Sequence, residues 1–364
     1  MGCARPLTAR SSTPTATASS SLTQTPFQTP PAVPPTSAPP PTSPSGQLVP
    51  AVQAVEQAAV STQLVSRTYQ WSYDGKQWTR EVAVPQVLYD YYRALPRTPT
   101  RNYSVYVTHP LDDEYIGLLT GKIRQCVQQE GYGDYQAVSL TAAFVQSLAH
   151  TSDSVTTGYD EYPRYPVETL VDNGGDCEDT AILAASLIEG LGYGAVLIIF
   201  PPTAESPGHC ALGVKGSEGI YGSYWEFDGE RYYYLETTDT GWEIGQVPDE
   251  YDGALARVYP MVPVPVLTHS WTVESSGATI ELKVTVNNLG SAAAYGIYVY
   301  AGFDAGDNQC WNPQKSPTFQ LGVNNSVVAT LYLIPPTDKH TRLLVQIVYE
   351  GYAVDESYSK WFDT

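Results

Sequence analysis

The chain has 364 residues, a formal net charge of −19 and only 19 lysines and arginines. It lacks blocks of Lys or Arg, which excludes the clustered positive charge that nucleic-acid binding requires. It also has no apolar run long enough to span a bilayer. The five cysteines show no metal-type spacing, so the sequence predicts neither a disulfide framework nor a metal, and we expect no cofactor.

Residues 1–46 are rich in Pro, Ser and Thr and predict a disordered tether. The sequence starts Met1-Gly2-Cys3, and Gly-Cys is how a lipoprotein signal ends, with the cysteine becoming the lipidated first residue. Two interpretations stay open: a membrane tether through a lipidated Cys3, whose signal would be absent from this sequence, or a disordered tail with an incidental cysteine. With the acidic, lysine-poor composition, the first predicts an extracellular or cell-surface protein.

The first folded domain is predicted over residues 47–259 and begins with a short helix over residues 47–67. Apolar and polar residues then alternate on either side of Asp74-Gly75, which predicts a β-hairpin from Tyr69 to Pro85. Helices are expected over residues 87–95, 112–130 and 134–150, and an ordered coil over residues 160–177.

The stretch DNGGDCEDTAILAASLIEGLG, residues 172–192, predicts an apolar helix with Cys177 at its start and Asp176 as N-cap. Asp179 takes the capping-box position. A thiol at a helix N-terminus is favoured as thiolate by the helix dipole, although the charges of Asp176, Glu178 and Asp179 act against this. These acids could recruit a cationic substrate group or merely stabilise the dipole, and we favour the second. On this stretch alone, an inert buried thiol is the better interpretation of Cys177.

Three strands are expected after this helix, over residues 195–200, 208–214 and 232–237. In GHCALGV, His209 shares its side of the strand with Ala211 and Gly213, which predicts free space beside the imidazole, as in a cleft. Glu236 lies in the aromatic strand YYYLET. A cysteine nucleophile needs a base for its proton, and the base needs an acceptor that orients it, so Cys177, His209 and Glu236 form the predicted catalytic set.

Residues 260–265, PMVPVP, form a predicted linker. Residues 266–364 contain short alternating strands, expected over residues 280–286, 295–301, 327–334 and 343–349. Their number and spacing predict an all-β sandwich of the immunoglobulin-like type.

The Gly-Asp-Cys-Glu-Asp motif, the Gly-His start of a strand and the aromatic strand ending in acid-Thr come in the order found in the transglutaminase-like branch of the papain-type cysteine hydrolases. The chain resembles that family over about residues 69–259, as a prokaryotic exported member. The resemblance implies an α+β core of helices packed on an antiparallel sheet. It also implies acyl transfer through a thioester, with Cys177 as nucleophile, His209 as general base and acid, and Glu236 as orienting acid. The family usually has aspartate at the last position, so Asp239 is the alternative.

The oxyanion hole would use the backbone N–H of Cys177. Gln146 is a second candidate by analogy with papain-like enzymes, but a surface glutamine is the better interpretation, and Trp225 is expected in the core rather than in a groove. The sequence thus predicts a thiol enzyme for peptide or protein amide bonds, with hydrolysis favoured over transfer to an amine. The alternative is an inactive cell-surface binding or scaffold protein. A metal-dependent hydrolase is the least favoured hypothesis, because His209 has no paired ligand.

Overall fold

The computed structural model describes residues 47–48, 63–97, 100, 102–159, 161–203, 208–216, 220–306 and 309–364. The chain divides into two compact units between Val262 and Pro263, and the predicted linker, residues 260–265, spans this division. The predicted tether, residues 1–46 with Cys3, lies outside the described residues.

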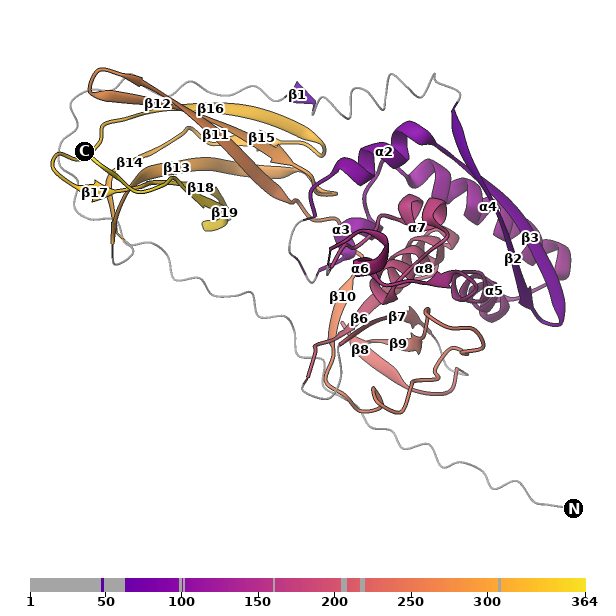
Figure 1. Cartoon of the computed structure of the whole chain (residues 1–364). Helices are drawn as coiled ribbons and strands as arrows, with labels where there is room; N and C mark the ends of the chain where they lie inside the picture. The colour runs from indigo at the N-terminus through magenta and orange to yellow at the C-terminus, as the bar shows by residue number, and fades with distance from the viewer. Residues whose placement is uncertain are drawn as a thin grey trace, which may run out of the picture. The chain divides into compact units, whose positions relative to one another are not determined.

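The first unit is organised around one buried helix, α8 (Cys177–Leu191), whose residues from Glu178 to Ile188 are all buried. Such a helix is apolar on nearly every side and must be covered all round. Helices α3, α4, α5 and α7 contact it, and the strands β6 and β7 cover another side (Figure 1). Among its described residues, the helices of this unit are α2 (Gln86–Ala94), α3 (Ser104–Val107), α4 (Asp113–Glu130), α5 (Asp134–Gln146), α6 (Asp153–Thr156), α7 (Pro166–Asp172) and α8.

The main sheet of this unit is antiparallel, with strand order β10-β6-β7-β9-β8. Its strands are β6 (Ala195–Phe200), β7 (His209–Lys215), β8 (Tyr224–Phe227), β9 (Glu230–Leu235) and β10 (Arg257–Pro260). Strand β7 pairs with β6 along its whole length up to His209, but with β9 only from Leu212, opposite Leu235. His209 and the residue that follows Leu235, Glu236, therefore lie at the same end of the sheet.

The predicted hairpin is present as β2 (Leu64–Tyr73) and β3 (Lys76–Pro85). Asp74 and Gly75 between them have φ of 52° and 69°, the left-handed pair that a two-residue turn requires. The helix predicted over residues 47–67 is wrong at both of its ends. Gln47–Leu48 form β1, and Leu64–Arg67 form the first part of β2. Residues 49–62 lie outside the described part of the chain. The longer strand arises because Leu64–Arg67 pair with Val82–Pro85 of β3.

Two further expectations are corrected around residues 147–177. The helix predicted to reach His150 ends at Gln146, and Ala149–His150 form β4, which pairs in parallel with β5 (Gly174–Gly175). The expected coil before Cys177 contains α7. Pro166 stands at its first position and Glu168 completes a capping box with the backbone N–H of Tyr165 at 2.9 Å, two signals that start a helix.

In the part of the second unit that the structure describes, the regular elements are all β-strands. One sheet has the order β1-β16-β12-β11, and the other has β14-β13-β18-β19 with β15 beside β13. Inward side chains of both sheets form one core, as in a sandwich, and include Leu282, Val284, Phe303 and Val345. The strands are β11 (Leu267–Ser276), β12 (Thr279–Asn288), β13 (Ala294–Gly306), β14 (Gln309–Lys315), β15 (Phe319–Leu321), β16 (Asn325–Leu333), β17 (His340–Thr341), β18 (Leu343–Tyr349), β19 (Tyr352–Tyr358) and β20 (Phe362–Asp363). Among the helices described in the chain, none is long and apolar enough to cross a membrane.

Candidate active site

Cys177 is the first residue of α8, and the helix start around it has the predicted caps. Asp176 has extended backbone angles, and its N–H donates to Oδ2 of Asp179 at 3.2 Å. The hydroxyl of Thr180 donates to the carbonyl of Asp176 at 2.9 Å. The polar groups of the first turn therefore fix the position of the Cys177 backbone.

A buried arginine, which the sequence analysis did not single out, holds this helix start in place. The side chain of Arg164 is 1% exposed. Its guanidinium donates from Nη1 to Asp153 at 2.8 Å, from Nη2 to Thr156 at 2.6 Å and from Nε to Asp172 at 3.1 Å. Asp179 accepts twice from the same residue, from Nη1 and, at 2.6 Å, from the backbone N–H. Burial raises the pKa of Asp179, and Arg164 acts against that rise. Arg164 thus connects α6, α7 and α8.

Gly175 lies directly against this network. A Cβ at Gly175 would lie 2.3 Å from Oδ2 of Asp179, closer than any real contact. Glycine is needed here because the chain approaches the capping carboxylate so closely. The second glycine of β5 (Gly174–Gly175), just before the Cys177 helix, therefore has a steric reason.

Glu178 does not have the role expected of a helix-terminal charge. It is 5% exposed, and the thiol of Cys177 donates to its Oε2 at 3.4 Å. Burial and then a hydrogen bond with Asp176 raise the pKa of Glu178 far above its ordinary value, so the group holds a proton at neutral pH. The expectation that the neighbouring acids are charges that stabilise the helix dipole therefore fails for Glu178. Asp179 takes the capping-box position expected of it.

The surroundings of Cys177 favour the neutral thiol. Burial is the main cause that raises the pKa of Cys177 well above its ordinary value, and the backbone N–H of Cys210 acts in the opposite direction. The helix dipole alone therefore does not make this cysteine a thiolate in the resting structure.

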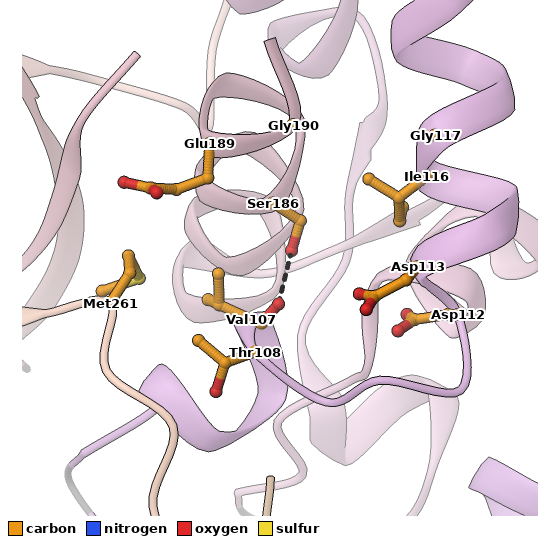
Figure 2. Close-up of a pocket in the computed structure, with 10 residues that line it drawn as sticks. All are labelled: Val107, Thr108, Asp112, Asp113, Ile116, Gly117, Ser186, Glu189, Gly190 and Met261. Carbon is orange, nitrogen blue, oxygen red and sulfur yellow. Dashed lines mark hydrogen bonds between the residues drawn. The ribbon is translucent and has the colours of Figure 1, made fainter. Parts of the chain in front are cut away.

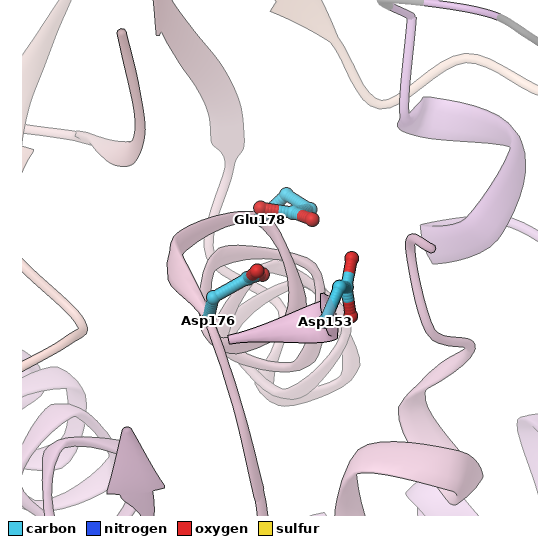
Figure 3. Close-up of side chains that lie close together, drawn as sticks. All are labelled: Asp153, Asp176 and Glu178. Carbon is cyan, nitrogen blue, oxygen red and sulfur yellow. The ribbon is translucent and has the colours of Figure 1, made fainter. Parts of the chain in front are cut away.

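Three carboxyl groups converge beside the helix start, as Figure 3 shows. Asp153, Asp176 and Glu178 each offer an oxygen, and these oxygens lie within 4.8 Å of one another. Carboxylate oxygens suit hard cations such as Ca²⁺. The three carboxyl groups are therefore a candidate cation site, which the spacing of these residues in the sequence did not indicate. A cation bound there would have to displace the proton of Glu178.

His209 and Glu236 are brought together by the ends of β7 and β9. Nε2 of His209 lies 2.8 Å from Oε2 of Glu236. The imidazole is stacked on Tyr251, with ring centroids 4.7 Å apart and an interplanar angle of 10°. The same oxygen of Glu236 accepts from Tyr234 at 2.7 Å, and Oε1 accepts from the backbone N–H and the hydroxyl of Thr238 at 3.1 and 2.7 Å.

These contacts determine the charge of Glu236. Burial alone would raise the pKa of Glu236, but the hydrogen bond and charge of His209, with Thr238 and Tyr234, lower it to about 2. Glu236 is therefore an ionised acceptor at neutral pH. Because a carboxylate only accepts, Nε2 of His209 carries a hydrogen in either charge state, and in the neutral imidazole Nδ1 is the basic nitrogen.

The free space predicted beside His209 is filled. Ala211, on the same side of β7, is fully buried in an aromatic cluster that includes Phe200, Trp225, Tyr234 and Tyr251. The small residues on this side make room for these rings rather than for a cleft. Trp225 is 2% exposed, so its expected place in the core is confirmed.

Within the described part of the chain, no hydrogen bond joins Cys177 to His209: the thiol donates to Glu178, and Nε2 of His209 pairs with Glu236. The start of β7 still lies beside the sulfur. The backbone N–H of Cys210 bonds to the thiol of Cys177 and thereby acts to lower its pKa. The structure thus joins His209 to Glu236 and places the next residue after His209 beside Cys177. The complete catalytic set stays a prediction.

The two alternative site residues, Gln146 and Asp239, make hydrogen bonds elsewhere. Gln146 is 5% exposed, not on the surface as expected, and its Nε2 donates to the carbonyls of Glu236 at 2.8 Å and Trp242 at 3.1 Å. Both amide hydrogens are used, so Gln146 cannot serve as an oxyanion donor without breaking one of these two bonds. Asp239 is exposed and accepts from the N–H of Thr240 at 2.7 Å, so it does not replace Glu236 as the partner of His209.

Comparisons with known proteins give distant structural likenesses only. No family model matches the chain, and no curated protein matches it. Among solved structures, it is similar to a protein from Cytophaga hutchinsonii that is provisionally assigned as a cysteine protease (11% identity, 60% of this chain and 75% of that chain, TM-score 0.25). It is also similar to red sea bream transglutaminase (9% identity, 85% and 63%, TM-score 0.20) and to the CARDB domain of the PF1109 protein from Pyrococcus furiosus, solved with di-metal ions (18% identity, 26% and 87%, TM-score 0.21).

Likenesses with such low TM-scores do not establish a shared fold. A mixed helix-and-strand unit followed by a two-sheet β unit is what the structure shows directly. The transglutaminase-like core and the immunoglobulin-like class of the second unit stay predictions.

Proposed function

We propose that this protein is a thiol enzyme that acts on amide bonds of peptides or proteins through a thioester on Cys177. The observation that carries the proposal is the 2.8 Å pair of His209 Nε2 and Glu236 Oε2 at the strand end beside the Cys177 helix. That pair leaves Nδ1 as the basic nitrogen, and an imidazole held by an ionised acid is the form that a cysteine nucleophile needs.

In the proposed reaction, Sγ of Cys177 attacks the amide carbonyl carbon while Nδ1 of His209 takes the thiol proton. The tetrahedral intermediate expels the amine, which receives that proton from His209, and a thioester remains. Water, deprotonated by His209, then attacks the thioester and releases the acid and the thiol. The backbone N–H of Cys177 at the helix start is the oxyanion donor that the chain offers.

The decisive test is incubation of the wild type and of Cys177→Ala with a peptide library, followed by mass spectrometry of the products and of the intact protein. The wild type should release cleavage products and carry a transient acyl adduct, and the variant should do neither. Equal products from the two proteins would remove the assignment. An added primary amine distinguishes hydrolysis, which we favour, from transfer.

A scaffold function without turnover is the second candidate, and a specific observation favours it. The thiol of Cys177 has a pKa well above its ordinary value and no hydrogen bond to His209. Incubation with the peptide library separates the two, because slow alkylation of the resting thiol is expected in both cases. No acyl adduct on Cys177 with any peptide would favour the scaffold.

Export and lipid anchoring through Cys3 are part of the proposal and concern residues outside the described part. The support is the Gly2-Cys3 start and the Ser/Thr/Pro-rich segment after it. Membrane fractionation of cells that naturally make the protein, compared with cells that make its Cys3→Ser variant, tests both. A variant that fractionates with the membrane as the wild type does would contradict the anchor.

A further inference from the structure

A cavity of about 360 Å³ lies in the first unit, at the end of α8 opposite to Cys177. The first turn of α4, the end of α3, the last turns of α8 and Met261 surround it, as Figure 2 shows. From Cys177 to Gly190 the helix rises about 20 Å at 1.5 Å per residue, so a ligand in this cavity does not meet the sulfur. The volume falls in the range of small-molecule sites.

The lining is acidic. It contains the carboxyl groups of Asp112, Asp113 and Glu189 and the hydroxyls of Thr108 and Ser186, and no Lys, Arg or His is among the residues that surround it. Arg124 donates to the carbonyl of Gly190 at 2.6 Å but is not part of the lining. The charge of the cavity is therefore suited to a cation.

Asp112 is the feature that points to a missing ligand. The residue is 1% exposed, and its Oδ2 has no hydrogen-bond partner among the described residues. Oδ1 is only 3.4 Å from the hydroxyl of Tyr92, which is itself bonded to Nδ1 of His109 at 2.7 Å. Figure 2 shows the carboxyl groups of Asp112 and Asp113 on the same side of the cavity. Burial, and then the charge of Asp113, raises the pKa of Asp112 well above its ordinary value, so without a ligand this carboxyl group holds its proton. A bound ammonium group would supply both a donor to Oδ2 and the positive charge that stabilises the carboxylate.

The spacing of the acids decides which kind of cation fits. In the described part of the chain, the oxygens of Asp112, Asp113 and Glu189 do not converge as those of a metal site do; the one such group is Asp153, Asp176 and Glu178. Figure 2 shows Glu189 directed away from the two aspartates, with Met261 beside it. Separated acids with apolar surface between them match an organic cation with two charged ends.

We infer that this cavity binds a short aliphatic diamine, with one ammonium group at Asp112 and Asp113 and the other near Glu189. Apolar atoms of Val107, Ile116 and Met261 would then contact the methylene chain. The site is separate from the proposed catalytic residues, and its occupancy does not depend on their activity.

Two variants test the site. Asp112→Asn keeps the shape of the side chain but replaces the carboxyl group, which can ionise when a cation binds, with an amide that cannot. Gly117→Leu fills the cavity, because a Cβ at Gly117 meets no atom within 4 Å and Gly117 lines the space. Gly121→Leu is the matched control: it lies one turn further along α4, also meets nothing within 4 Å, and does not line the cavity.

The experiment is calorimetric titration of the full chain with 1,5-diaminopentane, with 1,5-pentanediol, with glutarate and with CaCl₂. Saturable binding of the diamine, at least tenfold weaker in Asp112→Asn and absent in Gly117→Leu but kept in Gly121→Leu and in Cys177→Ala, is the expected result. Equal binding of the diol, diamine binding that Gly117→Leu leaves unchanged, no diamine binding by the wild type, or Ca²⁺ binding in place of the diamine would overturn the inference.

Discussion

The charge of Glu236 gives the sharpest test of the proposed catalytic arrangement. Its pKa lies at about 2 instead of the ordinary 4.5, and His209 is the largest contributor to that lowering. At 1.36 kcal/mol per pH unit, this difference corresponds to about 3 kcal/mol in favour of the charged carboxylate. Glu236→Gln removes the charge and keeps the size of the side chain.

Glutamine also changes the imidazole. Its amide can donate to Nε2 of His209, which would leave the hydrogen on Nδ1, the nitrogen that has to take the proton of Cys177. Both the lost charge and the wrong tautomer should slow the transfer of the Cys177 proton to His209. We expect kcat/KM for peptide cleavage to fall by about a hundredfold, the factor that about 3 kcal/mol represents.

The assay is hydrolysis of the best peptide from the library screen, with Asp239→Asn as control. Asp239 is exposed and bonded only to its neighbouring backbone N–H, so its variant should keep the wild-type rate. Circular dichroism and urea unfolding show that each variant is folded. A Glu236→Gln enzyme as active as the wild type, or an Asp239→Asn enzyme equally impaired, would refute the assignment of Glu236.

Three further predictions concern the support around Cys177. Arg164→Met should lower the free energy of unfolding by about 3–5 kcal/mol in urea titrations, because it leaves buried carboxylates without their cation; an unchanged midpoint would contradict this. Gly175→Ala should cost about 1–3 kcal/mol, since its Cβ would overlap the carboxylate of Asp179, whereas Gly117→Ala, which meets nothing, should not destabilise the protein. Asp153, with a pKa raised from 3.8 to about 6 mainly by burial, favours the folded state below pH 3.8, and about 3 kcal/mol of that stability should be lost as the pH rises through 6. Asp153→Asn should remove this part of the pH dependence of urea unfolding, and an unaltered profile would show that another group titrates there.

The parts of the fold that follow local rules were predictable from the sequence. Asp74-Gly75 requires left-handed backbone angles, and the hairpin follows from it. The Cys177 helix has an aspartate cap at its start and Gly192 in the left-handed conformation at its end, with φ of 94°. Both signals act over a few residues, so neighbouring elements could not override them.

The parts that depend on distant contacts were not predictable. Leu64–Arg67 extend a strand because β3 is available to pair with them, and local pattern alone favoured a helix. Gln146 was expected on the surface. In the structure its amide is buried and donates to the carbonyls of Glu236 and Trp242, which both follow β9 in the chain. A single sequence does not show these partners.

Arg164 illustrates a signal that was present but not used. A chain with 19 basic and 38 acidic residues has few cations to place, and this one stands between prolines and aromatics shortly before the acidic motif at Cys177. A buried acid-rich helix start needs a cation nearby, because buried charges must be paired. The composition could therefore have pointed to Arg164, although not to the four residues that its side chain contacts.

The electrostatics around Cys177 also constrain how a reaction could start. Glu178 holds a proton beside the sulfur, and burial keeps the thiol neutral, so a thiolate–imidazolium pair is not formed in advance. The proton of Cys177 would have to move to His209 during the attack on substrate, and Glu236 stabilises the cation that this transfer creates. If the thiolate were instead formed in advance, alkylation of Cys177 by iodoacetamide would be fast at pH 6 without any substrate. The structure predicts slow alkylation at that pH, and a rate that rises only in alkaline solution.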